Sequence, residues 1–136
     1  MDYEEEWGNV QEKCYELVNR VILLGSERFR CSEVLFSPEL VGFSYPGVHE
    51  MTNRAIVGAQ SQYHEELYGN VVLCGGSSLF PGMAERMKKE LVKLAPKTTK
   101  VNIIATPQRK YLVWMGGKVL ESMPSFNKSW FDKEEY

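Results

Sequence analysis

The stretch that decides the fold reads Val71-Val72-Leu73-Cys74-Gly75-Gly76-Ser77-Ser78-Leu79-Phe80-Pro81-Gly82. Its apolar start predicts a strand, and the glycine pair predicts a sharp turn that leads into a helix. Because glycine has no Cβ, a ligand or another backbone can come close at the carboxyl end of such a strand. Ligands bind at this edge in open α/β sheets. A Gly-Gly pair on its own is a weak signal, and an ordinary strand-to-helix turn would be the better interpretation without further support.

The segment after the turn predicts an amphipathic helix over 82–94. Its apolar residues recur every three or four positions and form one stripe: Met83, Met87, Leu91 and Leu94. The opposite face, interpreted as a solvated surface, carries Glu85, Arg86, Lys88, Lys89, Glu90 and Lys93. Pro96 ends the helix, and the β-prone run 101–105 predicts a second strand. The expected unit is therefore a sheet covered by a helix.

Other segments have weaker local signals. Helical turns or helices are expected at 2–10, 28–36, 49–59, 63–67 and 109–121, strands at 13–17 and 20–24, and a loop at 37–47. Ser32 is a candidate N-cap. The pair Gly116-Gly117 costs the last helix about 1 kcal/mol per glycine relative to alanine. A helix with that cost is typically one that packs tightly against another backbone.

Composition limits the classes of function. The chain has 136 residues, 43% of them hydrophobic and 25% charged, which predicts a soluble globular domain with a core. A net charge of -2 gives no electrostatic reason to expect nucleic acid or a membrane as partner. The acidic segment 1–7 is typical of neither a secretory signal nor a mitochondrial presequence. Cys14, Cys31 and Cys74 have no Cys-x-x-Cys spacing, so we interpret them as buried reduced thiols of a cytosolic protein.

Few residues suit catalysis. His49 and His64 are the only histidines, and neither lies in a nucleophile motif. Asp2 and Asp132 are the only aspartates, which is little material for a phosphoryl-transfer centre with metal-binding carboxylates. The sequence has no Walker A pattern. We therefore expect no catalytic residue, no metal site and no enzyme activity.

A resemblance supports the glycine turn as a site. The run 73–87 closely resembles the adenosine-contacting segment of actin. The similarity continues in the same order through 12–17, 25–31, 47–50, 94–96, 101–105 and 107–117. The chain is identified as a member of the actin family, an actin-like protein rather than a conventional actin. The resemblance implies an α/β fold, a partial actin-type domain of the ribonuclease-H-like ATPase kind with a sheet flanked by helices.

Within this single partial domain, 1–136, we expect a small α/β lobe at about 1–45, a sheet-and-helix body at 46–108 and a C-terminal helical segment at 109–136. The part that resembles actin lacks the family's two phosphate-binding hairpins and its extreme carboxyl terminus. It also lacks the family's residues that hold the metal and the attacking water. The resemblance therefore implies open strand edges and an uncovered helix face, which a partner protein would cover.

The resemblance also names site residues. An adenosine half-site would be bordered by Gly75, Gly76, Leu79, Phe80 and Lys110. Leu79 and Phe80 replace the Met-Tyr usual in actins, so the shape is kept and a hydroxyl is lost. Because a half-site without phosphate contacts loses affinity steeply, we interpret it as vestigial. No cofactor is expected from this chain alone, and ATP or ADP is expected only where a partner completes the site.

Two partner surfaces follow from the same resemblance. Leu40, Val41, Phe43 and Tyr45 match a loop near actin's inter-strand filament interface, and folding back onto their own core is an equally good interpretation. Met115, Val119, Leu120 and Met123 match one wall of the cleft that receives partner helices.

The predicted function is structural: an actin-like subunit of a larger cytoskeletal or axonemal assembly, without ATPase activity of its own. It would lie in the cytoplasm, at the cytoskeleton or in a cilium. Its partners would be proteins, actin or actin-like subunits among them, and neither nucleic acid nor membrane. Two alternatives stay open: a nucleotide-binding module completed by another chain, and a regulator that caps actin filaments.

Overall fold

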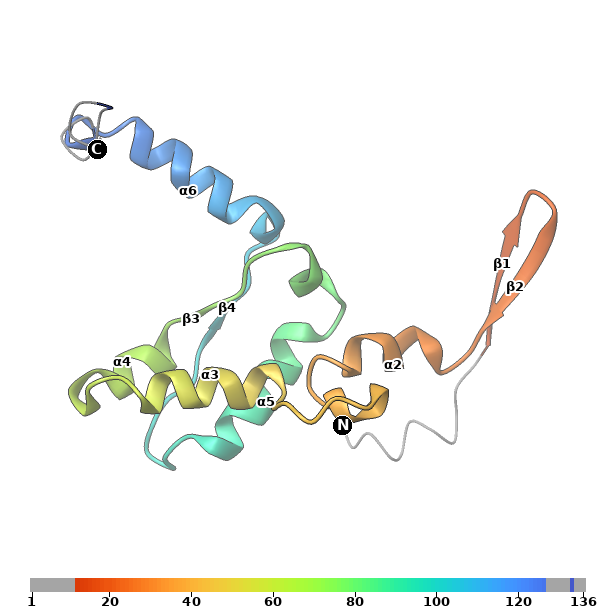
Figure 1. Cartoon of the computed structure of the whole chain (residues 1–136), viewed down its shortest axis with the longest axis horizontal. Coiled ribbons are helices and arrows are strands. Elements are labelled where there is room, and N and C mark those ends of the chain that lie inside the picture. The colour runs from red at the N-terminus through yellow and green to blue at the C-terminus, as the bar shows by residue number, and fades with distance from the viewer. Residues whose placement is uncertain (1–11, 127–132, 134–136) are drawn as a thin grey trace. The chain divides into compact units, whose positions relative to one another are not determined.

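The computed structural model describes residues 12–126 and residue 133, so the helix expected at 2–10 lies outside the described residues. The chain divides into two compact units, Met1–Thr52 and Asn53–Tyr136 (Figure 1). The architecture is mixed α/β, with two small sheets and several helices. The finer division at 1–45, 46–108 and 109–136 stays a prediction.

The first unit opens with a β-hairpin. Strands β1 (Lys13–Leu17) and β2 (Arg20–Leu24) pair antiparallel, with Tyr15 opposite Ile22. Both strands have the predicted bounds, because β-prone residues flank a two-residue turn. Every residue of β1 is exposed and Val18 in the turn is fully exposed. A two-stranded hairpin is at best marginally stable in water, so this one gains little from the described part of its unit.

Helix α2 (Glu27–Glu33) follows the hairpin and begins earlier than predicted. The prediction of Ser32 as its N-cap is wrong, because Ser32 lies in the last turn and its Oγ donates to the Phe29 carbonyl at 2.9 Å. The N-cap of the helix is instead Ser26, whose side chain makes no capping hydrogen bond. There the Gly25 N–H donates to the Glu27 carboxylate at 2.9 Å. Hydrogen bonds from the backbone N–H groups of Glu27 and Gly25 lower the pKa of the Glu27 carboxyl.

The backbone at Gly47 lies very close to the backbone at Phe36, just before the next helix begins. The 3-10 turn η1 (Pro38–Val41) ends at Gly42, and α3 (Val48–Val57) runs across residue 52, where the first unit ends. The Val48 N–H donates to the Leu35 carbonyl at 2.8 Å. A Cβ on Gly47 would overlap the Phe36 carbonyl oxygen and lie 2.7 Å from the Phe36 carbonyl carbon. This position therefore requires glycine.

The second unit contains a short parallel sheet. Strand β3 (Val71–Val72) pairs with β4 (Ile103–Ile104), in the register Val71 to Ile103 and Val72 to Ile104. The two strands lie where they were predicted, but the ladder holds only two residues of each. The remaining elements of this unit are η2 (Ser61–Tyr63), α4 (His64–Gly69), η3 (Gly76–Leu79), α5 (Met83–Leu94), η4 (Arg109–Tyr111) and α6 (Leu112–Glu121).

The core of the second unit centres on α5. Tyr68, Met87 and Leu91 are the largest fully buried side chains among the described residues. Each contributes about 1.5–3 kcal/mol through removal of apolar surface from water. The predicted stripe is confirmed at Met83, Met87 and Leu91. It is wrong at Leu94, the last residue of α5, which is 42% exposed.

The prediction that Glu90 lies on the solvated face of α5 is also wrong, because Glu90 is only 8% exposed. It lies two helical turns after Met83 and therefore on the buried side. Arg86 Nη1 donates to Glu90 Oε1 at 2.7 Å, and Lys93 Nζ donates to the two carboxylate oxygens at 2.9 and 3.0 Å. These charged donors make the burial of a carboxylate tolerable.

We predict that Gly47→Ala destabilises the chain by about 1–3 kcal/mol, because the new methyl group forces the Phe36 backbone to move. Urea unfolding followed by circular dichroism measures this change. The matched control is Gly69→Ala, since a Cβ at Gly69 meets nothing within 4 Å. Equal stability of the two variants would contradict the tight approach at Gly47.

A second prediction concerns Tyr68, whose hydroxyl donates to Asn53 Oδ1 at 2.5 Å. Burial raises the pKa of this phenol above its ordinary value of 10. The folded state therefore holds the phenol proton more tightly than the unfolded state does. This difference contributes in full to the free energy of unfolding below pH 10, and the contribution is lost as the pH rises through the folded pKa. Tyr68→Phe should cost about 1 kcal/mol at pH 7. Its free energy of unfolding should fall less than that of the wild type above pH 10, as alkaline urea titrations would show.

Candidate functional site

The glycine turn leaves β3 and leads into α5. Gly75 has φ 91° and ψ 162°, a conformation that L residues rarely adopt. The Gly75 N–H donates to the Arg109 carbonyl at 2.9 Å. Ser78 closes the turn, because its backbone N–H and its Oγ both donate to the Gly75 carbonyl, at 3.2 and 2.7 Å. The turn is thus a hydrogen-bonded unit that lies beside η4.

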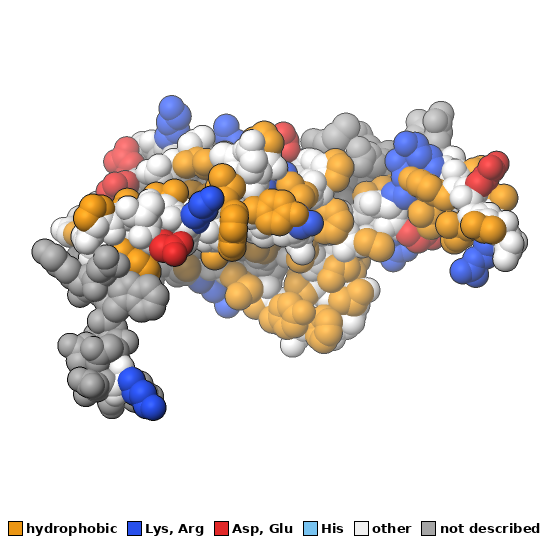
Figure 2. Space-filling view, turned by 90° about the horizontal axis from the view of Figure 1, so that it is seen from above, with side chains coloured by type: hydrophobic (Ala, Val, Ile, Leu, Met, Phe, Trp, Pro, Cys, Tyr) orange, Lys and Arg blue, Asp and Glu red, His pale blue; other side chains and the backbone are white. Residues whose placement is uncertain are grey.

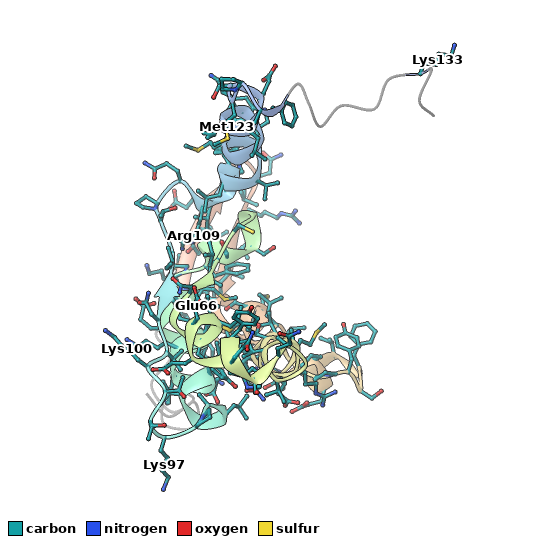
Figure 3. The ribbon with its side chains drawn as sticks, turned by 90° about the vertical axis from the view of Figure 1, so that its left-hand side faces the viewer. Glu66, Lys97, Lys100, Arg109, Met123 and Lys133 are labelled. Atoms are coloured by element: carbon teal, nitrogen blue, oxygen red, sulfur yellow. The ribbon has the colours of Figure 1, made fainter. Side chains whose placement is uncertain are left out.

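The side chain of Arg109 binds the same turn. Its Nε and Nη2 donate to the Ser78 carbonyl at 3.0 and 2.9 Å. Its Nη1 donates to the carbonyls of Thr106 and Ala105 at 3.1 and 3.5 Å. Figure 3 shows Arg109 between Met123, which follows α6, and Glu66 of α4. Sequence reasoning missed this role, because 31 residues separate Arg109 from Ser78 and local sequence carries no signal for the contact.

The five predicted adenosine residues fall into two neighbouring segments, η3 with its flanks and η4. Leu79 and Phe80 are 41% and 42% exposed. Lys110 is exposed in η4, and its Nζ lies 5.1 Å from the centroid of the Tyr111 ring. A Cβ at Gly75 or Gly76 would meet nothing within 4 Å. The hydrogen bond from Gly75 to Arg109 therefore brings the glycine pair next to the segment of Lys110, with open space over the glycines.

Helix α6 and the turn after it carry the second group of predicted residues. The described residues bury no side chain of α6. Met115, Val119, Leu120 and Met123 are 42–56% exposed. Tyr111, Trp114 and Met115 line an open apolar recess of about 520 Å³. Figure 2 shows hydrophobic side chains at many points of the face that it presents. The helix is therefore apolar on a broad face that the described residues leave uncovered.

The loop of the first unit is also exposed. Leu40, Val41, Phe43 and Tyr45 are 41–54% exposed. The rings of Phe43 and Tyr45 stack with centroids 5.1 Å apart and an interplanar angle of 23°. Of the two interpretations left open by the sequence, the fold-back onto a core does not describe these side chains. The loop instead presents a stacked aromatic pair just after η1.

The expectation of buried thiols is wrong, because Cys14, Cys31 and Cys74 are all free and exposed. Cys14 lies on the uncovered hairpin, and Cys74 lies between β3 and the glycine turn. Cysteine is often buried as a small apolar residue, but burial needs a covering element that local sequence does not reveal.

The two histidines have structural contacts. The His49 ring lies 5.7 Å from the Phe36 ring between centroids, and His64 Nε2 lies 3.0 Å from the Ala59 carbonyl oxygen. Among residues 12–126 and 133, no group of three or more His, Cys, Asp or Glu side chains is placed to hold a metal ion. The helices of that same part are all too short or too polar to span a bilayer.

The fold and turn define a mixed α/β protein in which a glycine turn follows a strand of a parallel sheet. Comparison with models of known protein families matches residues 3–136 to the actin family, so the chain belongs to the actin family. This confirms the family that the sequence resemblance predicted.

We predict that the native chain reacts with three equivalents of Ellman's reagent without denaturant, because all three thiols are exposed. Absorbance of the released thiolate measures the stoichiometry. Cys74→Ser should remove one equivalent and leave the far-ultraviolet circular dichroism unchanged. A requirement for denaturant to reach any of the three would contradict the exposure.

Proposed function

We propose that this actin-family chain is a structural subunit, held by partner proteins inside a larger cytoskeletal assembly, with no ATPase activity of its own. The observation that carries the proposal is that α6 has no residue buried by the described chain. A cytoplasmic cytoskeleton or an axoneme is the setting that suits such a subunit.

An uncovered α6 is hard to stabilise alone. It has ten residues, and isolated helices of that length are marginal in water. Gly116 and Gly117 weaken it further, by about 1 kcal/mol each relative to alanine. Its apolar side chains gain burial only when another surface packs on them. These costs favour a partner that covers α6 in the functional state.

The parallel sheet supports the same proposal. Strands β3 and β4 form a two-stranded sheet within the described residues, so each strand has one edge that pairs with nothing described. Open edges accept further strands. A ribonuclease-H-like sheet, as the resemblance implies, would be completed by strands that come from outside residues 12–126. The exposed loop at Leu40–Tyr45 offers a second apolar contact for a neighbouring subunit.

Gly116→Ala tests the proposed covering of α6. A Cβ at Gly116 meets nothing within 4 Å, so the free chain should gain about 1 kcal/mol of helix stability. A partner backbone packed on the glycine should be pushed away, which weakens binding by about tenfold. Purified actin, monomeric and filamentous, is the probe, in sedimentation and anisotropy titrations of the labelled full chain.

Lys97→Ala is the control, since Lys97 is exposed and lies outside α6, in the loop after α5. It should bind the probe as the wild type does. If both variants bind actin with unchanged affinity, or if the wild type does not bind it, actin does not cover α6.

A nucleotide-binding module is the second candidate, favoured by one observation: the glycine turn and the segment of Lys110 are already neighbours. Glycine backbone and the apolar side chains of Leu79 and Phe80 suit a purine. Another chain would supply the phosphate contacts. Calorimetry with Mg-ATP separates the two candidates, because micromolar binding by the isolated chain would exclude a purely structural role.

A further inference from the structure

The side chain of Arg109 uses all three guanidinium nitrogens on backbone carbonyls. Two nitrogens bond to Ser78 in the turn, and the third bonds to Thr106 and Ala105 after β4. The carbonyl of Arg109 in addition accepts the Gly75 N–H at 2.9 Å. One residue therefore connects the first and the fourth residue of the turn to the end of β4.

The turn has a particular need for such a connection. Gly75 and Gly76 give the free backbone many conformations, and Gly75 adopts a left-handed one, with φ 91°. Ordering this segment costs conformational entropy. In many sites a bound ligand supplies the contacts that offset this cost. Here the Arg109 guanidinium supplies such contacts, through two hydrogen bonds to the Ser78 carbonyl. Hydrogen bonds from charged donors are stronger than those from neutral donors.

We propose that Arg109 is the positioning residue of the adenosine half-site. Its fork holds the Gly75–Phe80 turn in shape when nothing is bound, and its backbone places Lys110 beside the glycines. The assignment of the turn to a purine rests on the second candidate function, whereas the organising role does not. A preformed turn lowers the entropy that a ligand must overcome. Arg109 thus acts through the turn and touches no ligand itself.

Hydrogen exchange of the full chain tests the organising role without any nucleotide. In Arg109→Ala, the amides of Gly75 and Ser78 should exchange about tenfold faster, because the turn opens more often. Amides of Met87 and Leu91 in α5 should keep their protection. Arg109→Lys should lie between, since an ammonium cannot reproduce the planar fork. Arg86→Lys, a change in an arginine that pairs with Glu90, is the control and should leave the turn unchanged.

Two results would overturn the role of Arg109. One is unchanged exchange at Gly75 and Ser78 in Arg109→Ala. The other is equal acceleration in the turn and in α5, which would show general destabilisation.

A titration with Mg-ATP tests the purine assignment separately. Binding by the wild type, weakened about tenfold in Arg109→Lys at unchanged thermal stability, supports a positioning role at a nucleotide site. Absence of binding by the wild type at millimolar Mg-ATP overturns the nucleotide assignment alone. The exchange pattern then still decides whether Arg109 organises the turn.

Discussion

The main constraint on this structure is its uncovered apolar surface. Several elements carry apolar side chains that no described residue covers. The core of the second unit is built from Tyr68, Met87 and Leu91, packed between α5 and its neighbours. Helix α6 and the β1–β2 hairpin lie outside such a core, and their apolar side chains remain exposed. Because hydrophobic burial is the dominant favourable term in folding, elements of this kind depend on further contacts. In the described residues, this uncovered apolar surface lies on α6 and on the hairpin.

Local sequence predicted the elements whose signal is local. The hairpin has its predicted bounds because β-prone runs flank Val18-Asn19, and α5 follows from the spacing of Met83, Met87 and Leu91. Features that depend on distant or tertiary neighbours were missed or wrong. Glu90 is buried because its position falls on the inner side of α5 and charged partners permit it. The exposure of the three thiols likewise depends on covering elements that no local pattern reveals.

The sequence indicated where the glycine turn lies, but not which residues hold it. The glycine pair and the resemblance both indicated the turn after β3, and the structure brings it beside η4. Arg109 could not be found this way, because its partner Ser78 is distant in sequence and backbone carbonyls have no sequence signature. Arginine is common at surfaces, where its five donors usually face water. Only the fold shows that this one faces carbonyl oxygens.

The two glycine pairs lie in different backbone conformations, and this difference indicates different roles. Gly75 is required by its own backbone, since its φ lies in the left-handed region. Gly116 and Gly117 lie in an ordinary helix, where alanine would be more stable and would meet no described atom. No contact among the described residues offsets the helix stability that these two glycines cost. Close packing of another surface against α6 would offset this cost, because small residues let two backbones approach. The first pair thus shapes a turn, and the second lies in an exposed helix, where small residues leave room for a close backbone contact.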